Sequence, residues 1–305
     1  MEGALDLFLQ QLLNGLTIGM IYALIALGYT MVYGVIQLIN FAHGEVFMAG
    51  AYLAMTALVF FGTLATPLPV WAVFAAVVLF SVVGSAALGA GIERVAYKPL
   101  RGSPKLTALI TSIGMSFFLQ NAVMLVYGAK EQSVPDIFPA GRLEAGPLSV
   151  SLLQGVIFAV SIGLMVLLTR FVRHTRTGKA LRALAQDPDT ARLMGVSVDS
   201  MIRLTFVLGS ALAAVGGALF GMYYGSVNFH DGYLAGLKAF TAAVFGGIGS
   251  IPGAMIGGIL LGIFEAMGAG YLSAEWKDVF AFVLLGAVLI FKPSGLLGEN
   301  VPEKV

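Results

Sequence analysis

Long stretches without a charged residue are the feature that most constrains this chain. Asp, Glu, Lys and Arg are absent from the tracts 7–42, 46–92, 106–129, 145–169, 204–229, 239–264 and 279–291. A helix of about 20 apolar residues is long enough to cross the hydrocarbon core of a bilayer. Inside that core every backbone polar group needs an internal partner, which a helix supplies to itself. The tracts therefore predict a series of membrane-spanning helices.

The composition agrees with lipid as the main solvent. Hydrophobic residues make up 58% of the 305 positions and charged residues 11%, whereas a soluble domain carries about 25% charged residues. A net charge of +1 argues against a nucleic-acid partner, which requires a clustered cationic surface. The absence of cysteine excludes disulfides, thiolate metal ligands and cysteine catalysis. The first residues lack a basic region and a cleavage site, so we expect no removable signal peptide.

Two Pro- or Gly-rich segments divide the longer tracts. The prolines of TPLP (66–69) split 46–92 into two helices, because proline removes a hydrogen-bond donor and restricts the residue before it. The segment GGIGSIPG (246–253) interrupts 239–264, and a broken helix at membrane depth needs protein or a water-filled cavity around it. We therefore expect an all-α integral membrane protein with a single transmembrane domain over 1–305. The domain is expected to be a polytopic bundle of eight or nine transmembrane helices, some of them interrupted.

The distribution of basic residues predicts the orientation of the bundle. Four basic residues lie in the loop 92–105 and seven in the loop 170–203, so these two loops hold 11 of the 17 Lys and Arg residues. Cytoplasmic loops carry such an excess. We expect both loops in the cytoplasm and the loop 129–150, which mixes acidic and basic residues, outside. Counting spans then places the N-terminus outside and the C-terminus inside.

The loop 170–203 is expected to contain two short helices. Residues 180–186 are rich in helix formers, Asp187 is a suitable N-cap with Pro188 behind it, and Gly195 ends the second helix. Residues 178–195, here called the knob, carry leucines among basic residues. This gives the knob a surface suited to docking into a partner's groove. The alternative is an interfacial helix that lies on anionic lipid.

Sequence signals of an enzyme are absent. No G-x-x-x-x-G-K-[ST] phosphate loop occurs, since the single Gly-Lys, at 178–179, is followed by alanine. The HExxH motif, the nucleophile elbow and carboxylate–histidine metal spacings are also missing. We predict a non-catalytic protein without cofactor or metal, so that any ATP hydrolysis would belong to other subunits.

Five polar residues at membrane depth are candidates for a translocation pathway or its gate. Glu265 lies in an apolar stretch, where an exposed carboxylate would cost several kcal/mol, and Lys238 begins the tract that breaks at 246–253. Asn40, His43 and Glu45 cluster where the first tract ends. In one interpretation these groups line a polar path for a zwitterion. In the other, they pair with each other and with broken-helix termini to hold the bundle together.

Several longer stretches carry a specific resemblance. The segments 14–45 (ending in INFAHGE), 92–121 and 237–258 (containing GGIGSIPGAMIGG), with KPSGLLG at 292–298, closely resemble the LivH-type permeases of branched-chain amino acid ABC transporters. The resemblance covers essentially the whole chain, although the loop 129–150 looks short. It implies an inner-membrane permease that imports leucine, isoleucine and valine. The implied partners are a second related permease, two cytoplasmic ATPase subunits and a periplasmic substrate-binding protein.

The resemblance also implies a role for the knob, which would be the coupling element that sits in the ATPase groove. The candidate coupling residues are Arg182, Leu184, Asp187, Arg192 and Leu193. Two alternative functions stay open. The same family includes permeases for urea and short amides, and an ion-coupled amino acid carrier would also use broken helices and a carboxylate such as Glu265. A passive channel is a third class, and dependence on ATP separates the three.

Overall fold

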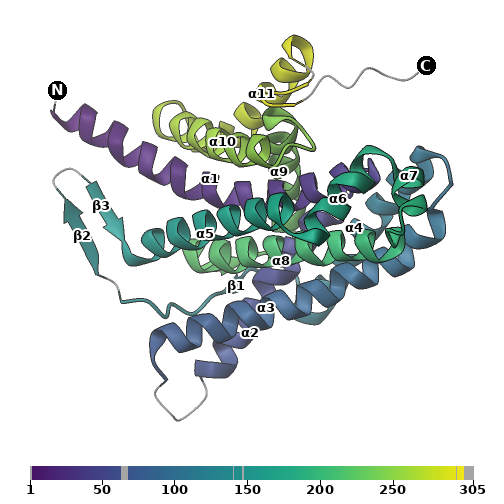
Figure 1. Cartoon of the computed structure of the whole chain (residues 1–305). Coiled ribbons are helices and arrows are strands. Elements are labelled where there is room, and N and C mark those ends of the chain that lie inside the picture. The colour runs from purple at the N-terminus through teal and green to yellow at the C-terminus, as the bar shows by residue number, and fades with distance from the viewer. Residues whose placement is uncertain (1, 63–67, 140, 146–147, 293, 299–305) are drawn as a thin grey trace.

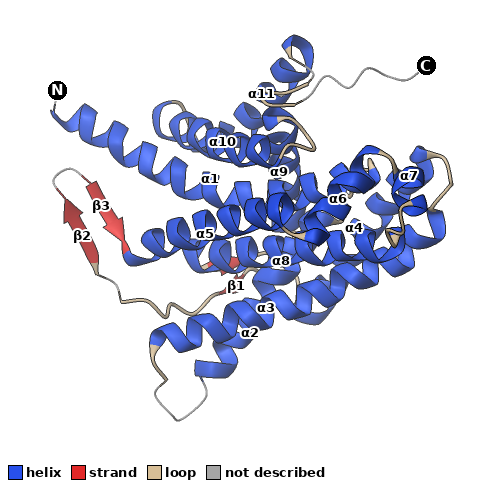
Figure 2. Cartoon of the chain, in the orientation of Figure 1, coloured by secondary structure: helices blue, strands red, loops and turns tan. Residues whose placement is uncertain are grey.

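The computed structural model describes residues 2–62, 68–139, 141–145, 148–292 and 294–298. Figures 1 and 2 show a bundle made almost entirely of helices, with a few short strands. The long helices are α1 (Glu2–Ile36), α2 (His43–Gly62), α3 (Val70–Ile92), α4 (Lys105–Tyr127), α5 (Leu152–His174), α8 (Val198–Tyr224), α9 (Asp231–Gly246), α10 (Ile251–Tyr271) and α11 (Lys277–Phe291). The expected all-α membrane fold is confirmed.

Seven helices in the described part of the chain are long and apolar enough to cross a membrane, namely α1 to α5, α8 and α10. Helices α9 and α11 are also apolar but have only 16 and 15 residues. At 1.5 Å per residue they reach about 23 Å, which is short of a hydrocarbon core of about 30 Å. The predicted eight or nine spans are reached only if one or both of these shorter helices are counted.

The predicted helix breaks are present. Helix α2 ends at Gly62 and α3 begins at Val70; the predicted break at 66–69 falls partly on residues 63–67, which lie outside the described residues. Helix α9 ends at Gly246 and α10 begins at Ile251, so the second break is confirmed. A third break separates α1 from α2, and Gln37 has a φ of 51° there.

Helix α1 is the centre of the bundle and packs along α10 and α8. In its most apolar stretch 89% of residues are buried, against 22% for α3 and 17% for α4. Helices α1 and α10 approach closely at a glycine seam, formed by Gly15 and Gly19 of α1 and by Gly258 and Gly262 of α10. A Cβ added to any of these glycines would meet the backbone of the other helix. Small residues allow this close backbone approach where lipid gives no hydrophobic drive between helices. The outward faces of α3 and α4 stay apolar and exposed.

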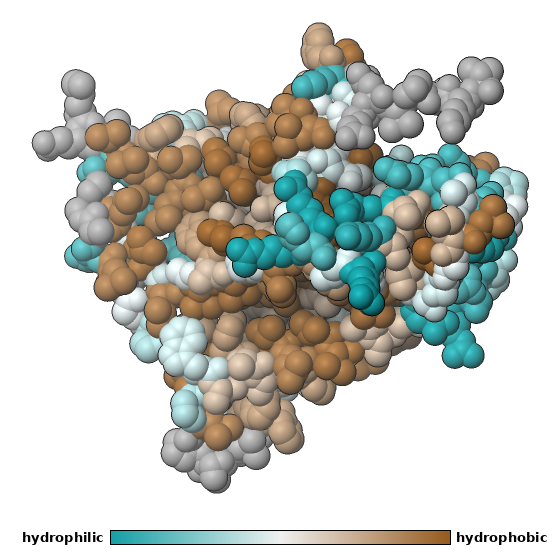
Figure 3. Space-filling model, in the orientation of Figure 1, coloured by the Kyte–Doolittle hydropathy of each residue, from teal (hydrophilic) through white to brown (hydrophobic). Residues whose placement is uncertain are grey.

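The two ends of the bundle differ in structure. One end, here called the hairpin end, carries the N-terminus and the antiparallel hairpin of β2 (Arg142–Ala145) and β3 (Leu148–Ser151) (Figure 1). Nearby, β1 (Gln132–Ser133) pairs with β4 (Ser226–Val227). The opposite, knob end carries α6 (Arg176–Gln186) and α7 (Pro188–Leu193). On the face drawn in Figure 3, hydrophilic residues gather toward the knob end and the middle is mostly hydrophobic.

Three short helical segments complete the described fold. A π-helical turn, η1 (Glu93–Tyr97), and a 3₁₀ turn, η2 (Lys98–Leu100), follow α3, and η3 (Ala274–Trp276) precedes α11. Residues after α11 return to the carboxyl end of α9. The N–H groups of Leu296 and Leu297 donate to the carbonyls of Phe245 and Gly246 at 2.8 and 2.9 Å. They satisfy carbonyl groups that the end of a helix leaves without partners.

Candidate functional site

Asn40 lies between α1 and α2 and fixes the break between them. Its side-chain oxygen accepts hydrogen bonds from the backbone N–H of Ala42 at 3.1 Å and from the hydroxyl of Tyr97 at 3.0 Å. An Asn side chain that binds the backbone two residues on holds a tight turn. Asn40 is buried, and its carbonyl oxygen already has two donors. The observed contacts therefore give it a structural task at the break.

His43 and Glu45 lie in the first turn of α2, but they face different neighbours. The His43 ring packs against Gly28 and meets the Tyr29 ring edge-on, with centroids 4.7 Å apart. Glu45 accepts a hydrogen bond from Ser116 of α4 at 2.9 Å, while its second oxygen is buried without a hydrogen-bond partner. The predicted cluster is close in sequence, yet its three side chains do not share one pocket. None of them lines either cavity described below.

Lys238 and Glu265, in contrast, are brought together. The Lys238 Nζ lies 2.8 Å from Oε1 of Glu265, and their side chains are 6% and 4% exposed. Asp278, at the start of α11, lies on the same ammonium group, with Oδ1 2.6 Å from Nζ. The Tyr22 hydroxyl of α1 is 3.4 Å from Nζ. The pairing that one interpretation of the sequence anticipated is present, and Asp278 is an additional member that the sequence did not single out.

A small cavity of about 190 Å³ opens beside this ion cluster. Its buried wall contains Tyr22, Lys238 and Glu265, and its less buried wall contains Asp231 and Lys277 from the hairpin end. The helices α1, α8, α9, α10 and α11 all contribute to it. Two of the five predicted pathway residues therefore lie on one cavity wall.

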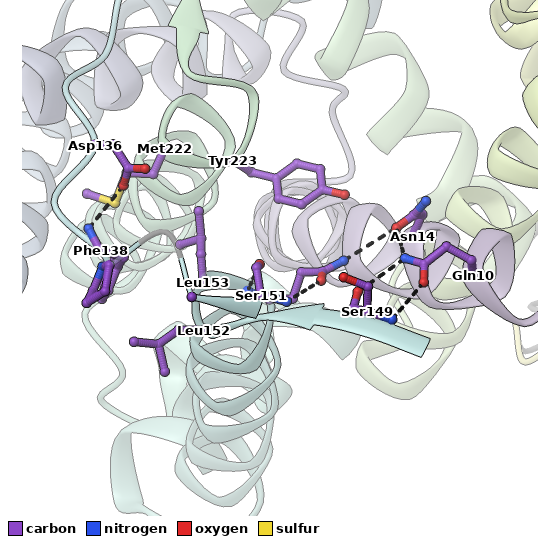
Figure 4. Close-up of a pocket in the computed structure, with 13 residues that line it drawn as sticks. Gln10, Asn14, Asp136, Phe138, Ser149, Ser151, Leu152, Leu153, Met222 and Tyr223 are labelled. Atoms are coloured by element: carbon purple, nitrogen blue, oxygen red, sulfur yellow. Dashed lines mark hydrogen bonds between the residues drawn. The ribbon is translucent and has the colours of Figure 1, made fainter. Parts of the chain in front are cut away.

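A larger pocket of about 780 Å³ lies at the hairpin end between α1, α5 and α8. Figure 4 shows the amides of Gln10 and Asn14 facing the first residues of α5 and the β3 strand. Gln10 donates to the carbonyl of Ser149 at 3.3 Å and accepts from its N–H at 3.1 Å, and Gln154 donates to Asn14 at 3.4 Å. Asp136 is the one charged residue among those that line the pocket. The pocket can hydrogen-bond a polar solute but supplies little charge. The sequence did not point to it, because its polar groups come from four separate segments.

The knob has the predicted caps. Asp187 accepts hydrogen bonds from the N–H groups of Asp189 and Thr190 at 3.0 and 3.1 Å, and Pro188 is the first residue of α7. Gly195 follows the last turn with a φ of 83°, a left-handed conformation that favours glycine. Helix α6 begins at Arg176, earlier than predicted, because the Thr175 hydroxyl accepts from the N–H of Gly178 at 2.9 Å.

The leucines of the knob have different environments. Leu184 is 1% exposed and belongs to the core of this chain, since α6 packs on α5, α1 and α8. Leu193 is 87% exposed and Met194 is 80% exposed. Leu184 is one of the residues predicted from the sequence to contact a partner, but its side chain faces inward. The surface that the knob presents is the α7 end, with Leu193 and Met194 beside Arg192.

The two arginine candidates of the knob, Arg182 and Arg192, make only weak contacts with the described residues. Arg182 donates to the carbonyl of Arg173 at 3.2 Å, and Arg192 lies 3.7 Å from Asp189 one turn earlier, with both side chains mostly exposed. Exposed pairs of this kind contribute at most about 1 kcal/mol. Arg182 and Arg192 are thus available at the surface of the knob end.

An ion cluster that the sequence did not reveal joins the two basic loops. Glu93, with a fully buried side chain in the π-helical turn η1, pairs with Arg101 and lies 3.7 Å from Arg203 of α8. Arg101 also pairs with Asp199, and Lys98 lies 3.5 Å from the same carboxylate. The loops 92–105 and 170–203 therefore meet at one end of the bundle, as the shared orientation predicted for them requires. The sequence does contain a signal for this cluster, because Glu93 directly follows the charge-free tract 46–92 and Arg101 lies in the loop after it.

The structure combines apolar helices of membrane length, breaks between them, polar cavities near one end and a basic helical projection at the other. Together these features define a polytopic membrane transport protein. Comparison with known proteins makes this class specific. The family model described as "Branched-chain amino acid transport system / permease component" matches residues 11–289. The chain belongs to this family of permeases.

Individual relatives are similar over almost the whole length. The chain is 52% identical to the high-affinity branched-chain amino acid transport system permease protein BraD of Pseudomonas aeruginosa, with 98% of each chain covered. It is 50% identical to the permease protein LivH of Escherichia coli K12, again with 98% of each covered. Among solved structures, PsaBC from Streptococcus pneumoniae in complex with Fab aligns with a TM-score of 0.48 and 15% identity, covering 94% of this chain and 92% of that one.

Proposed function

We propose that this chain is the membrane-spanning permease subunit of an ABC importer that moves leucine, isoleucine and valine into the cytoplasm. The observation that carries the proposal is identity of 50–52% over nearly the full length to permeases of branched-chain amino acid transport systems. The matched length spans the helix breaks and both basic loops.

Energy for transport would come from separate subunits. The sequence has no phosphate loop to hold ATP, so we assign hydrolysis to two cytoplasmic ATPase subunits. The knob is the proposed contact, with Leu193 exposed for docking and Arg182 and Arg192 also exposed on it. Asp187 holds α7 in shape, and Leu184 anchors α6 to the bundle. A second related permease and a periplasmic binding protein complete the proposed complex.

The proposed orientation follows from the charge of the two ends. The knob end holds the loops 92–105 and 170–203, with 11 of the 17 basic residues, so it is assigned to the cytoplasm of an inner-membrane protein. The hairpin end, with its polar pocket, then faces the binding protein. The N-terminus lies outside and α11 leads to a cytoplasmic C-terminus in this assignment.

Uptake by the complete complex in proteoliposomes tests the proposal. We expect accumulation of labelled leucine that requires ATP, both ATPase subunits and the binding protein, and no accumulation of labelled urea under the same conditions. Uptake of urea in preference to leucine would assign the chain to the amide branch of the family. Leucine uptake without ATP would contradict the importer assignment.

A second candidate, an ion-coupled amino acid carrier, is favoured by the buried cluster of Lys238, Glu265 and Asp278. Interrupted helices coordinate cations in secondary transporters, and intramembrane carboxylates form proton relays in pumps and transporters. The same proteoliposomes separate the two functions. A carrier would accumulate leucine when a sodium or proton gradient is imposed on vesicles that contain this chain without ATPase subunits.

A further inference from the structure

The cavity beside Lys238 has an excess of negative groups. Four carboxylates line it, from Glu131, Asp231, Glu265 and Asp278, against two ammonium groups, from Lys238 and Lys277. Coulomb interactions are stronger away from bulk water, so a lining of this kind favours a cationic guest. The charge alone indicates the sign of the guest and not its identity.

The built part of the site is the unused oxygen of Glu265. Oε1 of Glu265 binds Lys238 at 2.8 Å, whereas Oε2 is buried and has no hydrogen-bond partner. Glu265 is 4% exposed and forms part of the cavity wall. A buried acceptor without a donor costs about 1–3 kcal/mol, and more when it is charged. A donor that enters the cavity would remove this cost.

The surroundings favour a primary ammonium group over a metal ion. The ammonium of Lys238 already lies between Glu265 and Asp278, at 2.8 and 2.6 Å, and 5.8 Å from the centre of the Tyr22 ring. Carboxylates combined with aromatic faces are suited to organic ammonium groups. Calcium, by comparison, takes about six to eight oxygen ligands, whereas this lining also includes the aromatic side chains of Tyr22, Phe220 and Tyr224.

The size of the cavity limits the guest to a small molecule. Its volume of about 190 Å³ is below the roughly 300–1,000 Å³ of pockets for drug-sized ligands. We propose that the cavity is a subsite of the translocation pathway that takes the ammonium group of the transported amino acid, with Oε2 of Glu265 as its acceptor. Lys277, at the mouth, is the cationic group available to the carboxylate of the same zwitterion. This inference rests on the function proposed above and names the group of the substrate that is recognised.

Competition binding to the complex of permeases and ATPases, without binding protein, tests the subsite. Bound labelled leucine is challenged with one of two competitors: 3-methylbutylamine, which is leucine without its carboxylate, and 4-methylpentanoate, which is leucine without its amino group. We expect the amine to compete and the acid to fail. Glu265→Gln keeps the size of the side chain but loses its charge, and should weaken leucine binding by about 10- to 100-fold, the range for a hydrogen bond to a charged group.

A matched control is Glu275→Gln, which removes an exposed carboxylate near the hairpin end that does not line the cavity. It should bind leucine as the unchanged complex does. If Glu265→Gln fails to assemble, Asp278→Asn is measured instead, because Asp278 is 34% exposed at its side chain. It removes one negative charge from the lining but keeps the proposed acceptor, so a smaller loss of leucine affinity is expected.

Unchanged leucine binding by the assembled Glu265→Gln or Asp278→Asn complex would overturn the subsite, and so would equal competition by the acid and the amine. Displacement of leucine by millimolar sodium or potassium alone would also overturn it. The fourth contrary result is a complex that transports leucine but does not bind it. Failure of the unchanged complex to take up leucine with ATP and binding protein would instead contradict the proposed function. Uptake is measured separately, so the two failures are distinguishable.

Discussion

Replacing Leu184 by alanine should destabilise the knob, whereas the same replacement of Leu193 should not. Leu184 is 1% exposed and Leu193 is 87% exposed, although nine positions separate them. Truncating a buried leucine costs about 2–5 kcal/mol, because apolar contacts are lost and a cavity remains. An exposed substitution usually changes stability by less than about 0.5 kcal/mol. We therefore expect Leu184→Ala to loosen α6 and Leu193→Ala to leave it intact.

Limited trypsin digestion of the purified protein measures this difference, because Arg182 and Arg192 are exposed cleavage sites within the knob. When opening is fast relative to cleavage, the cleavage rate follows the population of the open form. A loss of about 2 kcal/mol then corresponds to about 30-fold faster cleavage in Leu184→Ala. Equal cleavage rates for Leu184→Ala and Leu193→Ala would refute the assigned burial.

A charged residue at position 193 separates the effect of docking from the effect of folding of the knob. Leu193→Glu places a charge on the exposed α7 surface and should leave the rate of trypsin cleavage after Arg182 unchanged. In the complete complex we expect it to remove the stimulation of ATP hydrolysis by loaded binding protein, and leucine uptake with it. Normal uptake by Leu193→Glu would show that the knob lies on lipid and does not couple to the ATPase.

Two further predictions concern topology and packing. Single cysteines at Ser103 and Thr190, both exposed at the knob end, should react with an impermeant thiol reagent only from the cytoplasmic side. A cysteine at the exposed Ser133 should react only from outside. The reverse labelling pattern would show that the orientation is inverted. Gly262→Ala should destabilise the protein by about 1–3 kcal/mol in thermal unfolding, since its Cβ would meet the backbone of α1. Gly114→Ala, with open space around it, is the control and should not destabilise, so equal losses would argue against the glycine seam.

Features that depend on local chemistry were predictable from the sequence. The caps of α7 follow from Asp187, Pro188 and Gly195, because each acts on the backbone within a few residues. The spans and the break at 246–253 follow from charge-free tracts and Gly/Pro segments, which act through the membrane solvent. These signals do not need the positions of other helices.

Features that depend on how helices pack were not predictable. Leu184 is buried because the apolar face of α6 packs against this chain. The amphipathic pattern alone does not say whether that face meets this chain or a partner. Asp278 joins Lys238 and Glu265 only because α11 returns beside α9 and α10. The hairpin of β2 and β3 was also missed, because its strands have four residues each, too few for their alternation of polar and apolar residues to stand out.

The hydrogen bonds from Leu296 and Leu297 to the end of α9 have a consequence for biosynthesis. About fifty residues separate these donors from their acceptors, Phe245 and Gly246. A ribosome that adds about 5–20 residues per second needs roughly 3–10 s to make that length. Throughout this interval the carboxyl end of α9 has carbonyl groups without these partners, and water or the insertion machinery must satisfy them. The junction between α9 and α10 is therefore completed only after both helices, and α11 as well, have left the ribosome.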